Sequence, residues 1–315
     1  MTFNSATTAF LFPGQGSQKV GMGKELSAAH PEARAVFDQA DELLGFPLST
    51  LSWEGPEADL NDTVNTQSAL LVHSVAALCV FQRMHRDFGP AYVAGHSLGE
   101  LSACVAAGAM DFPTALQVVR RRGELMKLAG QRNPGGMAAI LGLDVEALDK
   151  ICFTASIVGK EVVQVANDNC PGQVVISGHK GAVERAMTAA KAAGARRALP
   201  LAVSIAAHSP LMAGAQEEFR KAVDEALIEN PAIPIVGNVG ADLLETADQI
   251  RGDLYGQLTA RVHWTESIRN MRKRGVTTFV ELGTGSVLTG LLKRIDPEGE
   301  GMALGEPADF EKFSG

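Results

Sequence analysis

Cysteine, positive charge and long apolar segments are scarce in this 315-residue sequence, and each shortage excludes a class of protein. The cysteines lie far apart without C-x-x-C spacing, which argues against a disulfide or zinc framework and indicates reduced thiols. They are Cys79, Cys104, Cys152 and Cys170. With 28 basic against 36 acidic residues, a net charge of −8, the chain lacks the basic face that nucleic-acid binding requires.

No segment of the sequence predicts export or membrane insertion. Residues 1–10 contain neither the basic nor the apolar part of a secretory signal. The most apolar helical stretch, around residues 68–81, contains His73 and is too short to span a bilayer. We therefore expect a cytoplasmic protein that binds neither membrane nor nucleic acid.

Apolar runs alternate with helical patterns along most of the chain. Strands are predicted at 8–12, 91–94, 233–239 and 277–282, and helices at 22–44, 66–84, 98–107, 114–129, 210–227 and 287–295. Strands that alternate with helices form parallel sheets covered on both faces. The sequence therefore predicts an α/β fold with a parallel sheet.

A cluster of helix breakers at residues 131–136 marks a change of pattern. Beyond it, strands are predicted at 137–143, 162–166, 174–177 and 198–203, and helices at 145–151 and 180–193. This β-α-β-β-α-β order is that of a ferredoxin-like unit. We predict a small domain at 132–203, inserted into a larger domain formed by 1–131 and 204–315.

The most informative motif is Gly95-His96-Ser97-Leu98-Gly99, which lies between a predicted strand and a predicted helix. This is the setting of a nucleophile elbow, in which a sharp turn exposes the serine hydroxyl. The start of the following helix would offer the Leu98 N–H to an oxyanion. The motif alone also fits a glycine-rich turn with a serine N-cap.

A serine nucleophile needs a base, for which His208 is the best-placed histidine. His96 adjoins Ser97, but neighbours on a sharp turn point apart, so we expect it to support the elbow. His208 ends a strand-like run before a helix that begins with Ser209 as N-cap and Pro210. Sheet topology places such a loop beside the elbow, and the nearby helix N-terminus favours a neutral imidazole. A polar loop residue is the alternative.

Arg122 lies in the middle of the apolar face of the helix predicted at 114–129. That face is formed by Ala115, Val118, Val119, Leu125, Met126 and Ala129. A buried guanidinium needs a partner, either an internal carboxylate or one from a ligand. Because it grips a carboxylate with two hydrogen bonds, the ligand alternative predicts an acyl group derived from a dicarboxylic acid.

Residues 12–18, Phe-Pro-Gly-Gln-Gly-Ser-Gln, follow the first predicted strand. They form neither a dinucleotide fingerprint, because Lys19 occupies the third glycine position, nor a phosphate-binding P-loop. The loop is placed to bring a second backbone N–H to the carboxyl edge of the sheet. A plain turn is the alternative.

Together these segments resemble the malonyl-CoA:acyl carrier protein transacylase family. The resemblance spans residues 8–305 and is carried by residues 12–18, 95–100, Arg122-Gly123, 169–175, the histidine before a helix, and 287–291. It implies an α/β-hydrolase-like core with a ferredoxin-like insert, in agreement with the predicted order of segments.

The resemblance also implies roles for six residues. Ser97 would be acylated, His208 would be its base, and the N–H groups of Gln15 and Leu98 would form the oxyanion hole. Arg122 would hold the malonyl carboxylate, and Gln257 would orient the histidine through its backbone carbonyl. Many relatives have serine or phenylalanine before the histidine, whereas Ala206-Ala207 stand here and predict a larger acyl pocket.

The implied reaction moves a malonyl group from malonyl-CoA to the phosphopantetheine thiol of acyl carrier protein through a malonyl-serine, for fatty acid or polyketide synthesis. It needs no metal or prosthetic group, and we expect a monomer. A serine thioesterase or other hydrolase would share the elbow but have no use for Arg122. A non-catalytic carrier-binding module is a further alternative. The transacylase of a malonate decarboxylase or polyketide system would share the chemistry and differ in its partner.

An acidic carrier protein would need a local basic patch on this acidic chain. Two clusters are candidates: Lys191, Arg196 and Arg197 in the small domain, and Arg272, Lys273 and Arg274 in the large one. For either cluster, an ordinary solvated helix face is the alternative.

Overall fold

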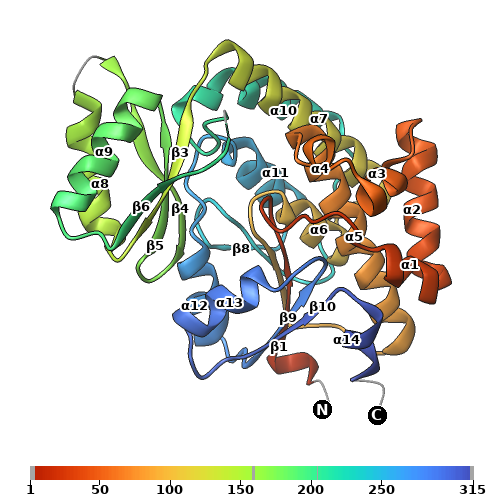
Figure 1. Ribbon diagram of the computed structural model, residues 1–315. Coiled ribbons are helices and arrows are strands. Elements are labelled where there is room, and N and C mark those ends of the chain that lie inside the picture. Colours follow the sequence, from red (N-terminus) through yellow and green to blue (C-terminus); the bar gives the residue numbers. More distant parts are fainter. Residues whose placement is uncertain (1–3, 158–159, 204, 313–315) are drawn as a thin grey trace.

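The computed structural model describes residues 4–157, 160–203 and 205–312 (Figure 1). Ser204, where the sequence analysis places the return to the large domain, lies outside the described residues. The same holds for residues 1–3 and 313–315 at the ends of that domain's predicted ranges.

Six strands form the larger sheet, in the order β10-β9-β1-β2-β7-β8. All neighbours are parallel except β7 and β8. The strands are β1 Thr8–Phe12, β2 Tyr92–Gly95, β7 Ile235–Val236, β8 Leu243–Leu244, β9 Thr278–Leu282 and β10 Glu300–Leu304. Every residue of the central strand β1 is buried, as expected where helices cover both faces of a parallel sheet.

Helices pack on both faces of this sheet (Figure 1). Successive residues of a strand point to opposite faces. Phe10 and Phe12 of β1 therefore pack among helices such as α2, α5, α7 and α10, whereas Ala9 and Leu11 pack against α12 and α13. The helices outside the small domain are α1 Lys24–Ala29, α2 Pro31–Leu44, α3 Leu48–Glu54, α4 Glu57–Leu60, α5 Thr63–Met84, α6 Gly99–Ala106, α7 Phe112–Arg132, α10 Ala213–Glu225, α11 Ala247–Gly256, α12 Trp264–Lys273, α13 Val287–Ile295 and α14 Pro307–Glu311, with 3-10 turns at Ser5–Thr7 and Pro210–Met212.

Helix α5 corrects one expectation. It has 22 residues, so the apolar helix predicted to be too short for a bilayer is long and apolar enough to cross one. Its position identifies it instead as a core helix, because 89% of its most apolar window is buried within the protein. The N-cap Asp62, whose side chain accepts from the Val64 N–H at 3.1 Å, starts the helix three residues before the predicted boundary.

The small domain has its own four-stranded antiparallel sheet, ordered β4-β5-β3-β6. Its elements run β3 Gly136–Leu141, α8 Val145–Ile157, β4 Val163–Cys170, β5 Gln173–Gly178, α9 Lys180–Ala192 and β6 Arg197–Pro200. This is the ferredoxin-like order that the sequence predicts, and it confirms the fold class. The Asp168 N–H donates to the Val262 carbonyl at 2.9 Å, which joins β4 to the chain before α12.

Two predicted strands are shorter than expected. The strand predicted at 233–239 consists of Ile235–Val236, because the chain bends at residues 238–240, where Asn238 bonds the Ser97 N–H. The strand predicted at 198–203 ends at Pro200, although the Leu201 N–H still donates to the Met137 carbonyl at 2.9 Å.

Candidate active site

Ser97 occupies a sharp turn between β2 and α6, with a left-handed φ of 53° that a non-glycine residue adopts at an energetic cost. The flanking glycines allow the strand and helix to approach. A Cβ on Gly95 would lie 1.9 Å from the Gly99 backbone, and a Cβ on Gly99 would lie 2.2 Å from the Phe12 carbonyl oxygen. The turn therefore requires glycine at both positions and holds the Ser97 hydroxyl at the carboxyl edge of the sheet.

His208 meets this hydroxyl: its Nε2 lies 2.9 Å from Ser97 Oγ. Its Nδ1 faces two backbone carbonyls, Gln257 O at 2.9 Å and Ala260 O at 3.1 Å. Because a carbonyl only accepts, Nδ1 carries the proton and Nε2 presents its lone pair to the serine. The ring is thus oriented to take the serine proton, with a carbonyl pair in the place where many serine enzymes have an aspartate.

The local structure around His208 differs from the predicted run into a helix. The described residues directly before it, 205–207, belong to no strand, and His208 itself has a left-handed φ of 56°. Ser209 then caps a 3-10 turn, Pro210–Met212, by accepting from the Leu211 N–H at 3.3 Å, and α10 begins only at Ala213. The chain therefore turns tightly at the histidine, which aims the ring inward.

Burial lowers the pKa of His208 to about 3, helped by the positive charge of Arg122 and by His96. The sequence predicts a neutral ring because of the nearby helix N-terminus. The direction agrees, but the causes are desolvation and the neighbouring guanidinium. The ring is therefore neutral at physiological pH.

Arg122, on α7, is 1% exposed, and its guanidinium reaches the same hydroxyl. Nη2 donates to Ser97 Oγ at 3.0 Å, Nη1 to Gln67 Oε1 at 2.7 Å and Nε to Gln257 Oε1 at 3.1 Å. All three partners are neutral, and within the described residues Arg122 forms no ion pair. Burial lowers its pKa to about 10, so it stays charged at neutral pH. The structure therefore contains a buried cation without an internal carboxylate in contact, as the ligand alternative requires.

Gln257 contributes more than its carbonyl. Its side-chain Nε2 donates to the Ser97 carbonyl at 3.1 Å and to Glu100 Oε2 at 2.8 Å, while its Oε1 accepts from Arg122. Asn238, which the sequence analysis did not single out, accepts from the Ser97 N–H at 2.9 Å and donates to the Gly95 carbonyl at 2.9 Å. Both amides therefore fix the backbone of the elbow.

His96 points away from the hydroxyl, as expected for a residue that supports the elbow. Its Nε2 lies 2.8 Å from Asn169 Oδ1, and its ring meets Trp264 edge-on at 5.4 Å between centroids. Asn169 is the residue before the last of β4, so this hydrogen bond links the small domain to the turn. The sequence signal for Asn169 was its place in one of the segments of family resemblance.

Among the described residues, the backbone N–H groups of Gln15 and Leu98, on the two loops that meet at the elbow, donate to no acceptor. The Gln15 loop packs on the elbow, because a Cβ on Gly14 would lie 2.5 Å from the His96 carbonyl oxygen. The Gln15 side chain donates to Thr63 Oγ1 at 2.9 Å. No protein acceptor in the described chain competes for these two N–H groups, and their role as an oxyanion hole stays a prediction.

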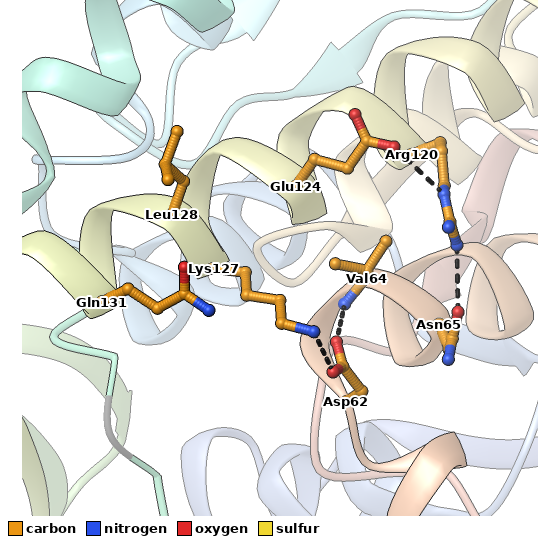
Figure 2. A pocket seen from close by; sticks show the side chains of 8 residues that line it. All are labelled: Asp62, Val64, Asn65, Arg120, Glu124, Lys127, Leu128 and Gln131. Carbon is orange, nitrogen blue, oxygen red and sulfur yellow. Dashed lines mark hydrogen bonds and ion pairs between the residues drawn. The ribbon is translucent and has the colours of Figure 1, made fainter.

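A cavity of about 190 Å³ leads to this loop, lined by Gln15, Asn61, Asp62, Thr63, Lys127, Ala202, Val203 and Ile205. It shares Asp62 and Lys127 with a wider pocket of about 360 Å³ on α7 (Figure 2). In that pocket Lys127 pairs with Asp62, and Arg120 pairs with Glu124 and bonds Asn65. Polar side chains at the start of α5 and on α7 thus line the cavity that Gln15 also lines.

The two alanines before His208, Ala206 and Ala207, differ from each other in burial and in their contacts. Ala206 is fully buried, and a Cβ on Gly135 would lie 2.5 Å from its methyl group. Ala207 is partly buried against the main apolar cluster. The small size of Ala206 therefore permits a close contact with the start of the small domain.

Comparison with known proteins identifies the family of the chain. The acyl transferase domain family model matches residues 9–299. The malonyl CoA-acyl carrier protein transacylase of Bacillus subtilis (strain 168) is 46% identical over 303 residues, which cover 96% of this chain and 95% of the relative. That of Escherichia coli (strain K12) is 45% identical over 300 residues, covering 95% and 96%.

Solved structures agree over the whole fold. An acyl carrier protein S-malonyltransferase from Vibrio cholerae has a TM-score of 0.93 at 45% identity, covering 98% of this chain and 99% of that one. A malonyl-transacylase structure in complex with a type II PKS acyl-carrier protein has a TM-score of 0.94 at 42% identity, covering 97% and 98%. Matches of this extent in sequence and fold place the chain in the malonyl CoA-acyl carrier protein transacylase family of acyl transferases.

Proposed function

We propose that the protein transfers the malonyl group of malonyl-CoA to the phosphopantetheine thiol of an acyl carrier protein, through an ester on Ser97. The observation that carries this proposal is the buried charge of Arg122, bonded to the same hydroxyl that His208 contacts. A nucleophile beside an unpaired buried cation favours an acyl group that ends in a carboxylate. Acyl carrier protein appears in the names of the relatives.

In the first half-reaction, Ser97 Oγ attacks the thioester carbon while its proton passes to His208 Nε2. The N–H groups of Gln15 and Leu98 stabilise the tetrahedral oxyanion. The carbon–sulfur bond then breaks, and His208 returns the proton to the leaving CoA sulfur. The product is a malonyl ester on Ser97, with its carboxylate on Arg122.

In the second half-reaction, the carrier thiol gives its proton to His208 and its sulfur attacks the ester carbon. The bond between that carbon and Oγ breaks, and the serine recovers its proton from His208. The acyl donor is a thioester in the first half-reaction and an ester in the second, so both transfers balance without a metal or prosthetic group. All the groups named come from one chain, which supports the proposal that the monomer is active. The free thiols support a cytoplasmic location.

The test is incubation with malonyl-CoA alone, followed by intact-mass and peptide mass spectrometry. A malonyl adduct on Ser97, absent from Ser97→Ala, supports the proposal, and an adduct elsewhere or none overturns it. Adding acyl carrier protein distinguishes transfer from hydrolysis. Malonyl carrier is the expected product, whereas free malonate as the main product would identify a thioesterase.

For the carrier we propose a docking surface on β6, near Arg196 and Arg197. In the other basic cluster, Arg272 pairs with Asp296 and Glu298, and Lys273 pairs with Glu266. Arg196 and Arg197 are exposed and form no ion pair among the described residues. The chain continues from β6 into Ala202 and Val203 at the cavity beside Gln15.

A charge reversal tests this surface. Arg197→Glu is expected to raise the KM for the carrier about tenfold, because rim charges steer association, and to leave malonylation of Ser97 by malonyl-CoA intact. Lys273→Glu is the matched control at the other basic cluster. An equal rise in both variants would show a general effect of net charge.

A further inference from the structure

We propose that Glu100 is a positioning residue that keeps a proton and shares it with Asp253, so that it orients the two amides of the elbow without neutralising Arg122. Its effect on malonyl transfer rests on the proposed function, but its protonation does not. Glu100 is the second residue of α6, three positions after Ser97, and is fully buried.

One oxygen of Glu100 holds both amides. Oε2 accepts from Asn238 Nδ2 and from Gln257 Nε2, the latter at 2.8 Å. An amide has two different ends, so fixing its nitrogen fixes its oxygen. The oxygen of Asn238 consequently faces the Ser97 N–H, and that of Gln257 faces Arg122 Nε. Glu100 thereby sets the orientation of side chains that contact the nucleophile's backbone and the cation.

The other oxygen of Glu100 reveals where the proton lies. Oε1 is buried and receives no hydrogen bond from any donor among the described residues. An ionised carboxylate in this position would leave a charged atom without a donor, at a high cost in free energy. A protonated Oε1 is itself a donor and needs an acceptor.

Asp253 supplies that acceptor. It is 9% exposed, and its carboxyl group neighbours that of Glu100, because Asn238 bonds both: its backbone N–H donates to Asp253 and its side-chain Nδ2 to Glu100. Both of its oxygens also accept from backbone: Oδ1 from the Val239 N–H at 3.1 Å, and Oδ2 from the Asn238 N–H at 3.2 Å. Two carboxyl groups in contact cannot both be ionised. The one with donors on both oxygens carries the charge, so the proton belongs to Glu100.

Electrostatics agree with this assignment. Burial and the charge of Asp253 raise the pKa of Glu100 well above its ordinary value. The ionisable groups that interact electrostatically with Glu100 are Asp253, Arg122 and Cys104. An ionised Glu100 would attract Arg122 and compete with a substrate carboxylate. A protonated Glu100 leaves the guanidinium with neutral partners.

Infrared spectroscopy tests the protonation directly. Protein labelled with ¹³C-carboxyl glutamate is expected to show a carboxylic-acid C=O band at neutral pH that is missing from Glu100→Gln. Glu281→Gln is the matched control: Glu281 is equally buried, but its oxygens accept from the Leu288 and Thr289 N–H groups, so the band should persist. A wild-type spectrum without the band overturns the proposal.

Kinetics test the positioning role. The amide of Glu100→Gln has the shape of the protonated acid, with an oxygen for the two amide donors and an N–H for Asp253. Glu100→Ala is expected to lower kcat for malonyl transfer about 10²-fold, the order expected for a lost site-orienting group, with a smaller change in KM. Glu100→Gln is expected to recover at least about tenfold of that loss. If the two variants are equally impaired, the proposal is wrong.

The two proposals fail differently. If the band is present but malonyl-CoA leaves no ester on Ser97, the proposed function fails and the protonation stands. If the ester forms and the band is missing, Glu100 is ionised and only this inference fails. If Glu100→Ala does not fold, the infrared spectra of the wild type and of Glu100→Gln still decide.

Discussion

Replacing Arg122 with methionine is expected to abolish the preference for acyl groups that end in a carboxylate. The guanidinium has five N–H groups, of which three are donated to Gln67, Ser97 and Gln257, so two remain for a substrate. A hydrogen bond between charged groups contributes about 1.5–3 kcal/mol, and two contribute about 3–6 kcal/mol. At about 1.4 kcal/mol per factor of ten, the ratio of kcat/KM for malonyl-CoA to that for acetyl-CoA should fall about 10²–10⁴-fold.

The ratio is the informative quantity, because the lost bond from Nη2 to Ser97 Oγ affects both acyl groups alike. The assay is transfer from malonyl-CoA and from acetyl-CoA to a generic acyl carrier protein, with free acid monitored in parallel. Arg121→Met is the matched control, because Arg121 is the adjacent residue and half-exposed, paired with Glu124. Equal losses for both acyl groups in Arg122→Met would show that Arg122 only supports the structure.

The same variant tests the electrostatic account of the base. The charge of Arg122 is one cause of the low pKa of His208, so removing it should raise that pKa from about 3 toward the ordinary value of about 6.5. Titration of the His208 ring by NMR in Arg122→Met measures the shift. An unchanged pKa would mean that desolvation alone keeps the ring neutral.

Three other perturbations follow from the structure. Because the pKa of His208 lies near 3 in the folded protein and near 6.5 when unfolded, the unfolded chain binds the extra proton between these values. The free energy of unfolding should therefore fall by about 1.4 kcal/mol per pH unit from this residue as pH drops below about 6.5, and a His208→Gln variant should lose that part of the dependence in urea titrations. Gly95→Ala would place a methyl group 1.9 Å from the Gly99 backbone, so we expect a lower Tm and no malonylation of Ser97; a variant with the normal Tm and rate would refute the close approach. Glu281→Ala removes a carboxylate that accepts from the first N–H groups of α13 and should lower the free energy of unfolding by about 3 kcal/mol, whereas a loss under about 0.5 kcal/mol would contradict its capping role.

Much of the fold could be predicted because its signals are local. The elbow is a five-residue pattern between an apolar run and a helix, and the insert is recognisable from the order of its six elements. Helices α11 and α12 were missed although they carry signals. Thr246 and Gln249 form a capping box, and Trp264, Ile268 and Met271 repeat at helical spacing on a buried face. These segments are short and mostly polar, so the sequence patterns that indicate a helix are weak in both.

The parts of the site that escaped prediction are long-range contacts between uncharged or neutralised groups. Asn238 follows a two-residue strand, and nothing in its neighbourhood indicates that it reaches Ser97, 141 positions earlier. Glu100 stands inside the recognised motif, but a carboxyl group at the start of a helix is ordinarily solvated or bonded to helix N–H groups. Only the folded chain shows that it is buried against Asp253 and two amides.

These contacts couple the binding of a substrate carboxylate to the basicity of His208. Arg122 donates to Ser97 Oγ and, together with burial, lowers the pKa of His208, so the base is neutral but weak. A carboxylate bound to Arg122 would cancel the charge that opposes imidazolium formation and would raise the basicity of His208 when the serine proton must move. An acyl group without a carboxylate leaves the base weak. Under the proposed function, selection for malonyl groups would then act on kcat as well as on KM, and it would depend on Glu100 staying neutral, because an ionised neighbour would cancel the same charge before the substrate arrived.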